Sequence, residues 1–392
     1  MFLSFIVYTA TALILYALAR NAVKRERFLL SNGNKELPFL CWETIFSLFL
    51  FAFISGVRYN VGVDHLSYLG EYQKLINYGV TNRTTFESGF LLITLLFAKN
   101  GIHFSIYFGF WALLQIGFLY YALRHEKRLL PFIALTLMLG PYYLSMMNGM
   151  RQQVVAFAFI FLIEWIEKKK MWSYIIAIFI ASTIHRSALL LLPFYFLLNS
   201  SFEITNRKLM FIILTICVIF GMTPTWLSIV NSAEGFLAMI GYNAYADKIE
   251  LMTSTKLREM AWGPSRISIF VANCFVVYYY KNIKEYFKED AKVRMYFILF
   301  FIGICGYNLF ANTSHIFLRP IGYFTLFSLP LYAYLMYYFI KKGKSLHFYF
   351  FLVLTCSYIY FTIIKSSLNP SILGETSLYK FFWDYLPMIN QL

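Results

Sequence analysis

Charged residues are scarce in this chain of 392 residues: 14% are Asp, Glu, Lys or Arg, whereas 60% are hydrophobic. This composition excludes an ordinary soluble domain, because uncharged apolar runs long enough to cross about 30 Å of hydrocarbon recur from one end to the other. The runs are continuously apolar and do not alternate in polarity, which favours membrane helices over membrane strands. The sequence therefore predicts an all-α, polytopic membrane protein with a single integral membrane domain, residues 1–392.

Acidic residues are scarcer than basic ones, with 19 Asp and Glu against 34 Lys and Arg and a formal net charge of +15. In a soluble protein this excess would indicate nucleic acid, but 21 of the 34 basic residues lie in six short loops. Because basic loops stay in the cytoplasm, we expect these loops there and no nucleic acid partner. The six loops are Arg20–Lys35, Arg124–Arg128, Lys168–Lys170, Arg207–Lys208, Lys281–Arg294 and Lys341–Lys344.

Patterns of metal ligands are also absent. The five cysteines lie inside or beside apolar runs without paired spacing, which favours packing roles over a disulfide framework or a zinc site. No Asp-x-Asp pair occurs in a predicted outer loop, so the signature of metal-dependent glycosyl transfer is missing. We therefore expect neither a metal nor any other cofactor.

Twelve apolar runs are expected to cross the membrane, with both chain termini outside the cytoplasm. Their ranges are Phe2–Ala19, Phe39–Ser55, Ile102–Leu123, Leu129–Met147, Val154–Ile166, Met171–Ile184, Ala188–Leu198, Leu209–Val230, Ile267–Tyr280, Met295–Ala311, Phe317–Ile340 and Leu346–Ile364. The first run has no basic region before it and basic residues after it, so we expect a retained span and no cleaved signal peptide.

A thirteenth apolar run, Phe90–Ala98, is too short to cross the membrane. Counting it as a crossing would also turn the basic loop Arg124–Arg128 outward, so we expect a short re-entrant helix. The larger outer segments are then the loops 56–101 and 231–266 and the tail 365–392.

Polar groups gather at the predicted outer ends of the spans. Charges at the edge of hydrocarbon are costly, so a cluster of them is a hypothesis of function. Arginine presents a permanently charged fork of donors that suits phosphate oxygens, and we infer a diphosphate ligand. For each arginine alone, snorkelling to lipid headgroups is the alternative. The candidate diphosphate-binding residues are Arg58, Arg151, Arg186 and Arg319.

His185 is the leading candidate for a general base, because imidazole exchanges protons near neutral pH and the adjacent Arg186 favours its neutral form. A capping or packing role is the alternative. Asp64 and Glu87 frame the first outer loop; we expect Asp64 to position arginines, and Glu87 to bind substrate or act as a base. An Asx-type turn is the alternative for Asp64. Further candidate substrate contacts are Gln152, Tyr68, Tyr323 and His315.

The order of these pieces resembles the EpsG/Wzy-type polysaccharide polymerase family. The resemblance rests on Arg58-x3-Gly62-x-Asp64-x3-Tyr68, Glu87-x-Gly89-Phe90, Met150-Arg151-Gln152, His185-Arg186-Ser187-Ala188 and Arg319-x3-Tyr323. Each motif is short, and the match depends on their order and on their shared outer location. It covers Val57 to about Tyr323, and the turn at His315 and the C-terminal tail match no part of the pattern.

The resemblance implies an architecture like the GT-C glycosyltransferases and a metal-independent, inverting polymerase of undecaprenyl-diphosphate-linked oligosaccharide repeats. It implies a location in the bacterial inner membrane, with the site on the periplasmic side. Implied partners are undecaprenyl-diphosphate-linked glycans, membrane lipids and a chain-length regulator protein. In such a reaction the arginines stabilise the leaving diphosphate.

Other classes stay open. A flippase of lipid-linked sugars also needs cations, but it would place charges along a path through several helices, and here the mid-span regions are nearly uncharged. An O-antigen ligase or a single-sugar GT-C transferase would share the leaving group and differ in its acceptor. A membrane acyltransferase would place its histidine toward cytoplasmic acyl-CoA, whereas His185 is predicted outside.

Overall fold

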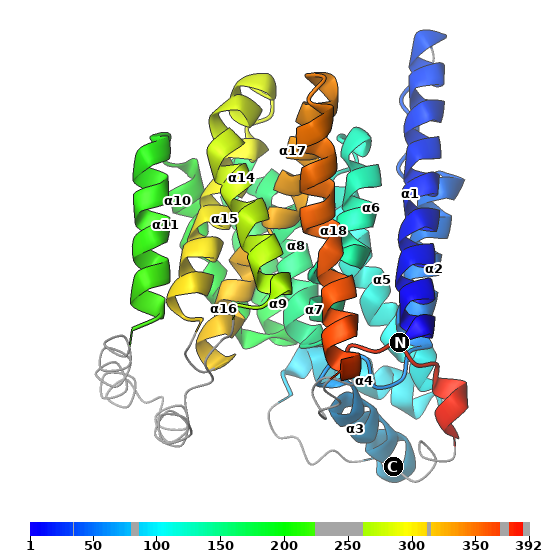
Figure 1. Cartoon of the computed structure of the whole chain (residues 1–392). Helices are drawn as coiled ribbons and strands as arrows, with labels where there is room; N and C mark the ends of the chain where they lie inside the picture. The colour runs from blue at the N-terminus through cyan, green and yellow to red at the C-terminus, as the bar shows by residue number, and fades with distance from the viewer. Residues whose placement is uncertain (34, 80–85, 224–261, 312–314, 369–375, 387–392) are drawn as a thin grey trace.

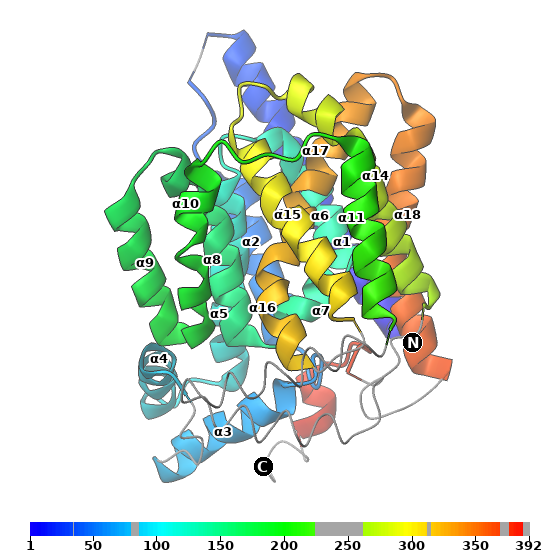
Figure 2. The same ribbon diagram turned by 90° about the vertical axis from the view of Figure 1, so that its left-hand side faces the viewer.

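The computed structural model describes residues 1–33, 35–79, 86–223, 262–311, 315–368 and 376–386. Over these ranges the chain forms helices and no strand, which confirms the all-α prediction. Most of the helices stand side by side in one bundle, with α3 and α4 across one end of it (Figures 1 and 2). The helices are α1 (Phe2–Ser31), α2 (Trp42–Gly56), α3 (His65–Tyr78), α4 (Ser88–Lys99), α5 (Phe104–Ala122), η1 (Lys127–Leu129), α6 (Leu130–Leu139), α7 (Tyr142–Met147), α8 (Met150–Glu167), α9 (Met171–Ile184), η2 (Arg186–Leu191), α10 (Phe194–Asn199), α11 (Arg207–Gly221), α14 (Pro264–Tyr286), α15 (Lys292–Leu309), α16 (His315–Thr325), α17 (Ser328–Lys341), α18 (Ser345–Leu368) and η3 (Phe382–Tyr385).

By length and composition, five stretches in the described part of the chain are suited to crossing a membrane. They are Phe2–Ser31, Phe104–Ala122, Lys292–Leu309, Leu318–Lys341 and Ser345–Leu368. Shorter apolar helices accompany them, α2, α4 and α9 among these. The structure thus supports a multi-pass membrane protein, while twelve crossings and the GT-C-like architecture stay predictions.

Three of the predicted spans are divided. The run Ala188–Leu198 falls partly on η2 and partly on α10, with a turn at residues 192–193. The run Leu129–Met147 was expected to be continuous, but it breaks between α6 and α7 at Gly140-Pro141. Pro141 disfavours helical backbone at the residue before it and lacks the N–H that would continue the helix. In the run Phe317–Ile340, α16 and α17 are separated by a turn at residues 326–327, and Pro330 has no N–H to bond across that turn.

Close backbone approach holds the helices near the site in place. Gly56 ends α2 against α5, where a Cβ atom would overlap the Ser105 carbonyl oxygen, and Gly109 faces it from α5. This contact brings the segment that follows α2 onto the bundle. The core around it is strongly aromatic, with Tyr8 and Phe51 packed edge-on against Tyr143.

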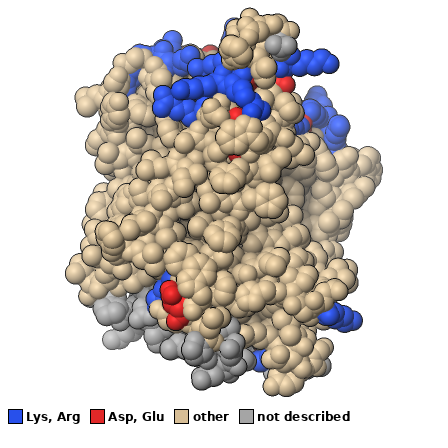
Figure 3. Space-filling view, turned by 90° about the vertical axis from the view of Figure 1, so that its right-hand side faces the viewer, with Lys and Arg blue, Asp and Glu red and all other residues tan. Residues whose placement is uncertain are grey.

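The two ends of the bundle differ in charge. Most Lys and Arg side chains gather at one end (Figure 3), where the six basic loops connect the helices. We call this the basic end. Helices α3 and α4 lie at the opposite end, together with the N-terminus and residues 376–386 (Figures 1 and 2). We call this the α3–α4 end; the predicted grouping of the basic loops on one side is confirmed.

Two predicted outer segments are described only in part. The loop 231–266 falls mostly on residues 224–261, which lie outside the described residues. Of the tail 365–392, residues 376–386 pack on the segment after α2. The Tyr59 amide donates to the Lys380 carbonyl (2.8 Å), and the Phe382 amide donates to the Val57 carbonyl (3.0 Å). The tail therefore helps to hold the segment that follows α2 against the bundle.

Candidate functional site

Glu87 lies where the ends of three helices meet. It immediately precedes α4, while His185 follows the last residue of α9 and Arg151 belongs to the first turn of α8. Gly89 allows this meeting, because a Cβ atom at this position would overlap the side chain of Thr183 near the end of α9. The glycine in the Glu87-x-Gly89-Phe90 motif thus brings the carboxylate of α4 against the histidine of α9.

The Glu87 carboxylate accepts hydrogen bonds from three donors. One oxygen pairs with the Arg151 guanidinium. The other accepts from His185 Nδ1 at 3.1 Å and from the Arg186 amide at 3.2 Å. The side chain of Glu87 is only 8% exposed, so these contacts replace nearly all of its hydration. One acid therefore links α4, α8 and the turn between α9 and η2.

The ionised Glu87 carboxylate determines which tautomer a neutral His185 adopts. Burial by itself raises the pKa of Glu87, but the hydrogen bond from His185 and the charge of Arg151 outweigh it and lower the pKa from 4.5 to about 2. An ionised carboxylate only accepts hydrogen bonds, so His185 must hold a proton on Nδ1. In neutral His185 the other nitrogen, Nε2, is then the proton acceptor. The side chain is 22% exposed, and Nε2 has no partner among the described residues.

Arg151 is enclosed by aromatic rings as well as by Glu87. Its Nε donates to the Tyr68 hydroxyl at 3.2 Å, and its guanidinium carbon lies 5.2 Å from the centre of the Phe86 ring and 5.4 Å from that of Phe90. The side chain is 15% exposed. The charge of Arg151 is thus largely matched inside the protein, and Tyr68 is brought to the site through it.

Helix α16 contacts residues next to the Glu87 cluster. The side-chain amide of Gln152 donates to the Arg319 carbonyl, and the Tyr323 hydroxyl lies 2.7 Å from the Ser187 hydroxyl. Gln152 follows Arg151, and Ser187 follows Arg186, so both contacts attach α16 beside the Glu87 cluster. Arg319 and Tyr323, which are four residues apart, both belong to α16.

Arg186 and Arg319 differ from Arg151 in having free side chains. Both are exposed, and neither guanidinium has a hydrogen bond or a carboxylate partner among the residues that the structure describes. Their backbones, in contrast, are fixed: the Arg186 amide by Glu87 and the Arg319 carbonyl by Gln152. Two guanidinium groups without a described acceptor, on fixed backbones beside His185, are suited to a polyanion.

Asp64 supports the start of α8. Its carboxylate accepts from the Gly149 amide at 3.2 Å, and its own amide donates to the Asn148 side chain at 3.3 Å. Gly149 precedes α8, so the negative Asp64 carboxylate interacts favourably with the positive end of the helix dipole. The hydrogen bond also fixes the turn two residues before Arg151. Gly62 permits this approach, since its φ of +90° suits glycine and a Cβ atom would overlap the Met147 carbonyl.

Arg58 is placed apart from the contacts of Glu87. It is 2% exposed; its Nε donates to the Val61 carbonyl at 3.2 Å and its Nη1 to the Ser55 carbonyl, and it lies over the Phe108 ring. These hydrogen bonds thus stabilise the turn that follows α2. His65 stacks on Phe108 nearby, and burial together with Arg58 lowers the pKa of His65 well below its usual range.

One predicted residue cannot be assessed, and two were missed. The side chain of His315 lies outside the described residues. Ser187 and Phe86 were not predicted as site residues; Ser187 belongs to the His185 motif, and that adjacency was the available signal. No group of three His, Cys, Asp or Glu residues in the described ranges is arranged to hold a metal ion, and metal independence stays a prediction.

The arrangement can abstract a proton and hold an anion. His185 supplies the acceptor nitrogen, Glu87 orients it, and Arg186 and Arg319 supply free positive charge on adjacent elements. None of the curated proteins and none of the solved structures compared with the chain matches it. A family model, the EpsG family, matches residues 42–381, a range that contains every element of this site. Because that match spans most of the 392 residues, the chain belongs to the EpsG family.

Proposed function

We propose that the protein is a polymerase that joins undecaprenyl-diphosphate-linked oligosaccharide repeats at the outer face of the bacterial cytoplasmic membrane. Membership of the EpsG family points to a membrane protein of polysaccharide biosynthesis. The observation that carries the finer assignment is the oriented His185, with Nδ1 bonded to Glu87 and Nε2 without a described partner, beside two unpaired arginines. The concentration of basic loops at the opposite end supports an outward-facing site.

His185 is proposed as the general base. A hydroxyl of the acceptor repeat gives its proton to Nε2 while its oxygen bonds to the anomeric carbon of the donor glycan. The bond from that carbon to the diphosphate oxygen breaks in the same step, and the electron pair leaves with undecaprenyl diphosphate. Displacement from the opposite face inverts the anomeric centre. Proton transfer to a positioned base of this kind contributes about 10²–10⁴-fold to a rate.

Glu87 is proposed as a positioning residue and not as the base. A carboxylate whose pKa is held at about 2 is a weak proton acceptor at neutral pH. Its two oxygens are occupied by Arg151, His185 and the Arg186 amide. Glu87 therefore sets the tautomer of His185, while Asp64 acts one step further away through the start of α8.

Arg186 and Arg319 are proposed to bind the diphosphate. Negative charge grows on the leaving group as the glycosidic bond breaks, and fixed donors stabilise that charge without reorganisation. Arg151 is already paired with Glu87, so it contributes positive charge behind the two free arginines. Arg58 is proposed to organise the outer segment, since its described contacts are to that segment and to Phe108.

The test is a polymerisation assay with the purified full chain and a synthetic undecaprenyl-diphosphate repeat, in the presence of a chelator. We expect a ladder of glycan lengths with inverted linkages. Arg319→Ala should lower turnover about 10²–10³-fold, as loss of one charge-stabilising donor does. Arg27→Ala is the matched control, because Arg27 is also an exposed arginine but lies at the basic end.

Two outcomes would overturn the proposal. One is equal loss of turnover in Arg319→Ala and Arg27→Ala. The other is the absence of a ladder from any lipid-linked repeat, together with movement of labelled lipid across proteoliposomes. The second result would assign the protein to lipid transport.

A further inference from the structure

The C-terminal tail returns to the α3–α4 end and pairs with the segment that follows α2. Arg58 and Phe381 face each other in an antiparallel bridge, with main-chain hydrogen bonds on both sides of it. The Gly62 amide donates to the Thr376 carbonyl at 2.9 Å. Residues 57–62 are therefore bonded to the tail at both of their ends.

This segment has a backbone that needs such support. Residues 57–62 form no helix, and both Asn60 (φ +52°) and Gly62 (φ +90°) adopt the left-handed region. Backbone of this kind keeps its shape where the surrounding contacts hold it. The main-chain bonds from the tail supply contacts that the segment cannot make within itself.

Tyr379 anchors the tail to the bundle. It is 2% exposed; its hydroxyl donates to the Ile54 carbonyl at 2.6 Å, near the end of α2, and its amide donates to Ser4 Oγ at 2.9 Å, in the first turn of α1. Its ring packs edge-on against the rings of Tyr8 and Phe381. One residue of the tail thus joins α1, α2 and the bridge.

The bonded segment leads directly to the reaction site. Gly62 lies two residues before Asp64, whose carboxylate accepts from the Gly149 amide at 3.2 Å. Gly149 in turn lies two residues before Arg151, which pairs with Glu87. A continuous series of short chain segments and hydrogen bonds therefore connects the tail with the Glu87 cluster.

We propose that residues 376–386, anchored by Tyr379, are a positioning element for the reaction site. They hold the segment after α2 so that Asp64 fixes the start of α8 in the place that Glu87 requires. The inference rests on the proposed function, since the turnover that it controls is the one assigned to His185. The described contacts of Tyr379 are with α1, α2 and the tail, so its effect on the reaction is indirect.

Amide hydrogen exchange of the purified full chain, followed by mass spectrometry of its peptides, tests this connection without any substrate. Tyr379→Ala removes the ring and the hydroxyl of the anchor. Exchange in the peptides that contain Gly62 and Gly149 should become about tenfold faster, the factor that corresponds to one lost hydrogen bond. Exchange in residues 165–171, at the basic end, should stay the same, because a general loss of stability would raise exchange everywhere.

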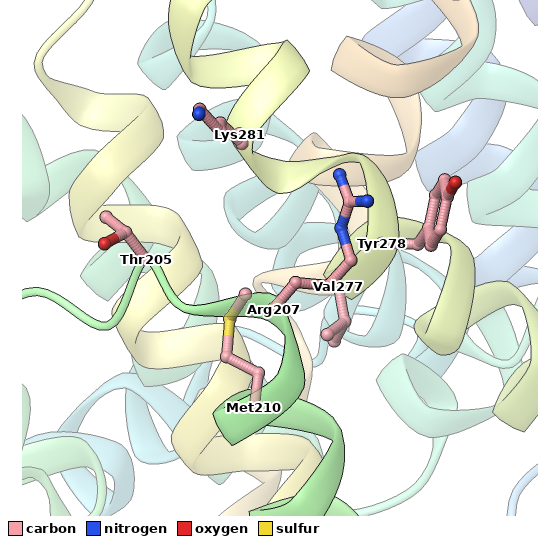
Figure 4. A pocket seen from close by; sticks show the side chains of 6 residues that line it. All are labelled: Thr205, Arg207, Met210, Val277, Tyr278 and Lys281. Carbon is pink, nitrogen blue, oxygen red and sulfur yellow. The ribbon is translucent and has the colours of Figure 1, made fainter.

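Tyr280→Ala is the matched control. Tyr280 is 1% exposed and its hydroxyl donates to Glu203 at 2.5 Å, but it belongs to α14 near the basic end. Figure 4 shows this region, with Tyr278 and Lys281 on the two sides of residue 280 in sequence. The control should change exchange after α2 and at the start of α8 by less than about twofold, as expected for distant sites.

Turnover with the lipid-linked repeat is the second readout. Tyr379→Ala should lower it about 10²-fold, because a displacement of about 1 Å in a positioned group has an effect of that size. Tyr379→Phe keeps the ring and the amide bond to Ser4, and should restore turnover to within about tenfold of wild type.

A milder pair of variants serves if Tyr379→Ala does not fold. Ser4→Ala removes one anchoring hydrogen bond and should make exchange at Gly62 and Gly149 several times faster. Ser47→Ala is its control, because Ser47 of α2 is equally buried and donates to the Glu43 carbonyl, away from the tail.

Faster exchange at Gly149 and lower turnover in Tyr379→Ala, with neither change in Tyr280→Ala, support the proposal. Unchanged exchange at Gly149, or an equal increase throughout the bundle, would overturn it, and so would full turnover in Tyr379→Ala. Failure of the proposed function has a different signature: the wild type would then give no ladder, while the exchange pattern would still show whether the tail positions α8.

Discussion

The two ends of the bundle use charge in opposite ways. At the basic end cations are numerous and several are matched by acids, as in Arg124–Glu164 at 2.7 Å and Lys284–Glu203 at 2.6 Å. At the α3–α4 end cations are fewer, and one carboxylate, that of Glu87, serves three donors. The density of charge is therefore a poor guide to function here, and its pairing is a better one.

Exposure to water varies among the ion pairs of the basic end. Lys281–Glu285 is 70% and 62% exposed, so water screens the pair and it contributes little, whereas Arg124–Glu164 is 15% and 11% exposed. At the α3–α4 end the Glu87 carboxylate is nearly dry, so each donor it holds is strongly bound and fixed in place. The same small cluster leaves Arg186 and Arg319 exposed, which concentrates unpaired positive charge beside His185.

The largest effect is expected at His185. His185→Ala removes the proposed proton acceptor and should lower turnover about 10²–10⁴-fold, while the protein still folds because the side chain is only partly buried. His125→Ala is the control, since His125 is an exposed histidine at the basic end. Turnover measured with the lipid-linked repeat checks this prediction. Comparable turnover in His185→Ala and His125→Ala would contradict the claim that the reaction depends on the α3–α4 end.

A smaller effect is expected from Glu87→Gln, which leaves Arg151 without its carboxylate. The loss of stability should be about 2 kcal/mol, the penalty of an unpaired charged donor in a mostly buried position. Thermal unfolding in detergent measures it, and Glu289→Gln is the matched control at an exposed acid of the basic end. An equal melting temperature for Glu87→Gln and wild type would contradict the account.

The stabilisation by Glu87 should also depend on pH. Its pKa is about 2 in the folded protein and 4.5 in its ordinary state. A carboxyl group with a lowered folded pKa contributes stability that is fully present above 4.5 and is lost as the pH falls toward 2. The difference in stability between wild type and Glu87→Gln should therefore shrink as the pH falls below about 4.5. A difference that grows as the pH falls from about 4.5 toward 3 would be inconsistent with an ionised Glu87.

The smallest effect is expected at an ion pair of the basic end. Lys168 pairs with Glu164, but Lys168 is 52% exposed and Glu164 is also held by Arg124. Lys168→Ala should change the free energy of unfolding by less than about 0.5 kcal/mol and leave turnover unaltered. A loss as large as that of Glu87→Gln would mean that the two ends do not differ in how they use charge.

Much of the helical framework was predictable because membrane spans are long apolar runs. The predicted run Ile102–Leu123 agrees with α5, and the predicted short helix Phe90–Ala98 agrees with α4 within two residues. The breaks at Gly140-Pro141 and at residues 326–327 were not predicted. Hydropathy is averaged over a long window, so it does not detect a turn that a single proline imposes. Whether α4 is re-entrant depends on a membrane boundary, and this stays a prediction.

The site was predictable as a set of residues but not as a set of contacts. The motif order brought Glu87, Arg151, His185 and Arg319 to one end, and the structure links them through Glu87 and α16. Sequence could not show that Glu87 occupies Arg151 and orients His185, since that depends on Gly89 seating α4 against α9. Sequence also could not separate Arg58 from the other arginines; its backbone forms a bridge with Phe381 of the distant tail.

The central claim is that the diphosphate binds at the α3–α4 end, and photo-crosslinking tests it most directly. A photoreactive group on the first isoprene units of undecaprenyl diphosphate would report where the diphosphate sits in the purified full chain, with crosslinked peptides identified by mass spectrometry. The account predicts crosslinks near His185 and Arg319 that are lost in the double variant R186A/R319A. Crosslinks concentrated at the basic end, or unchanged in that variant, would contradict it.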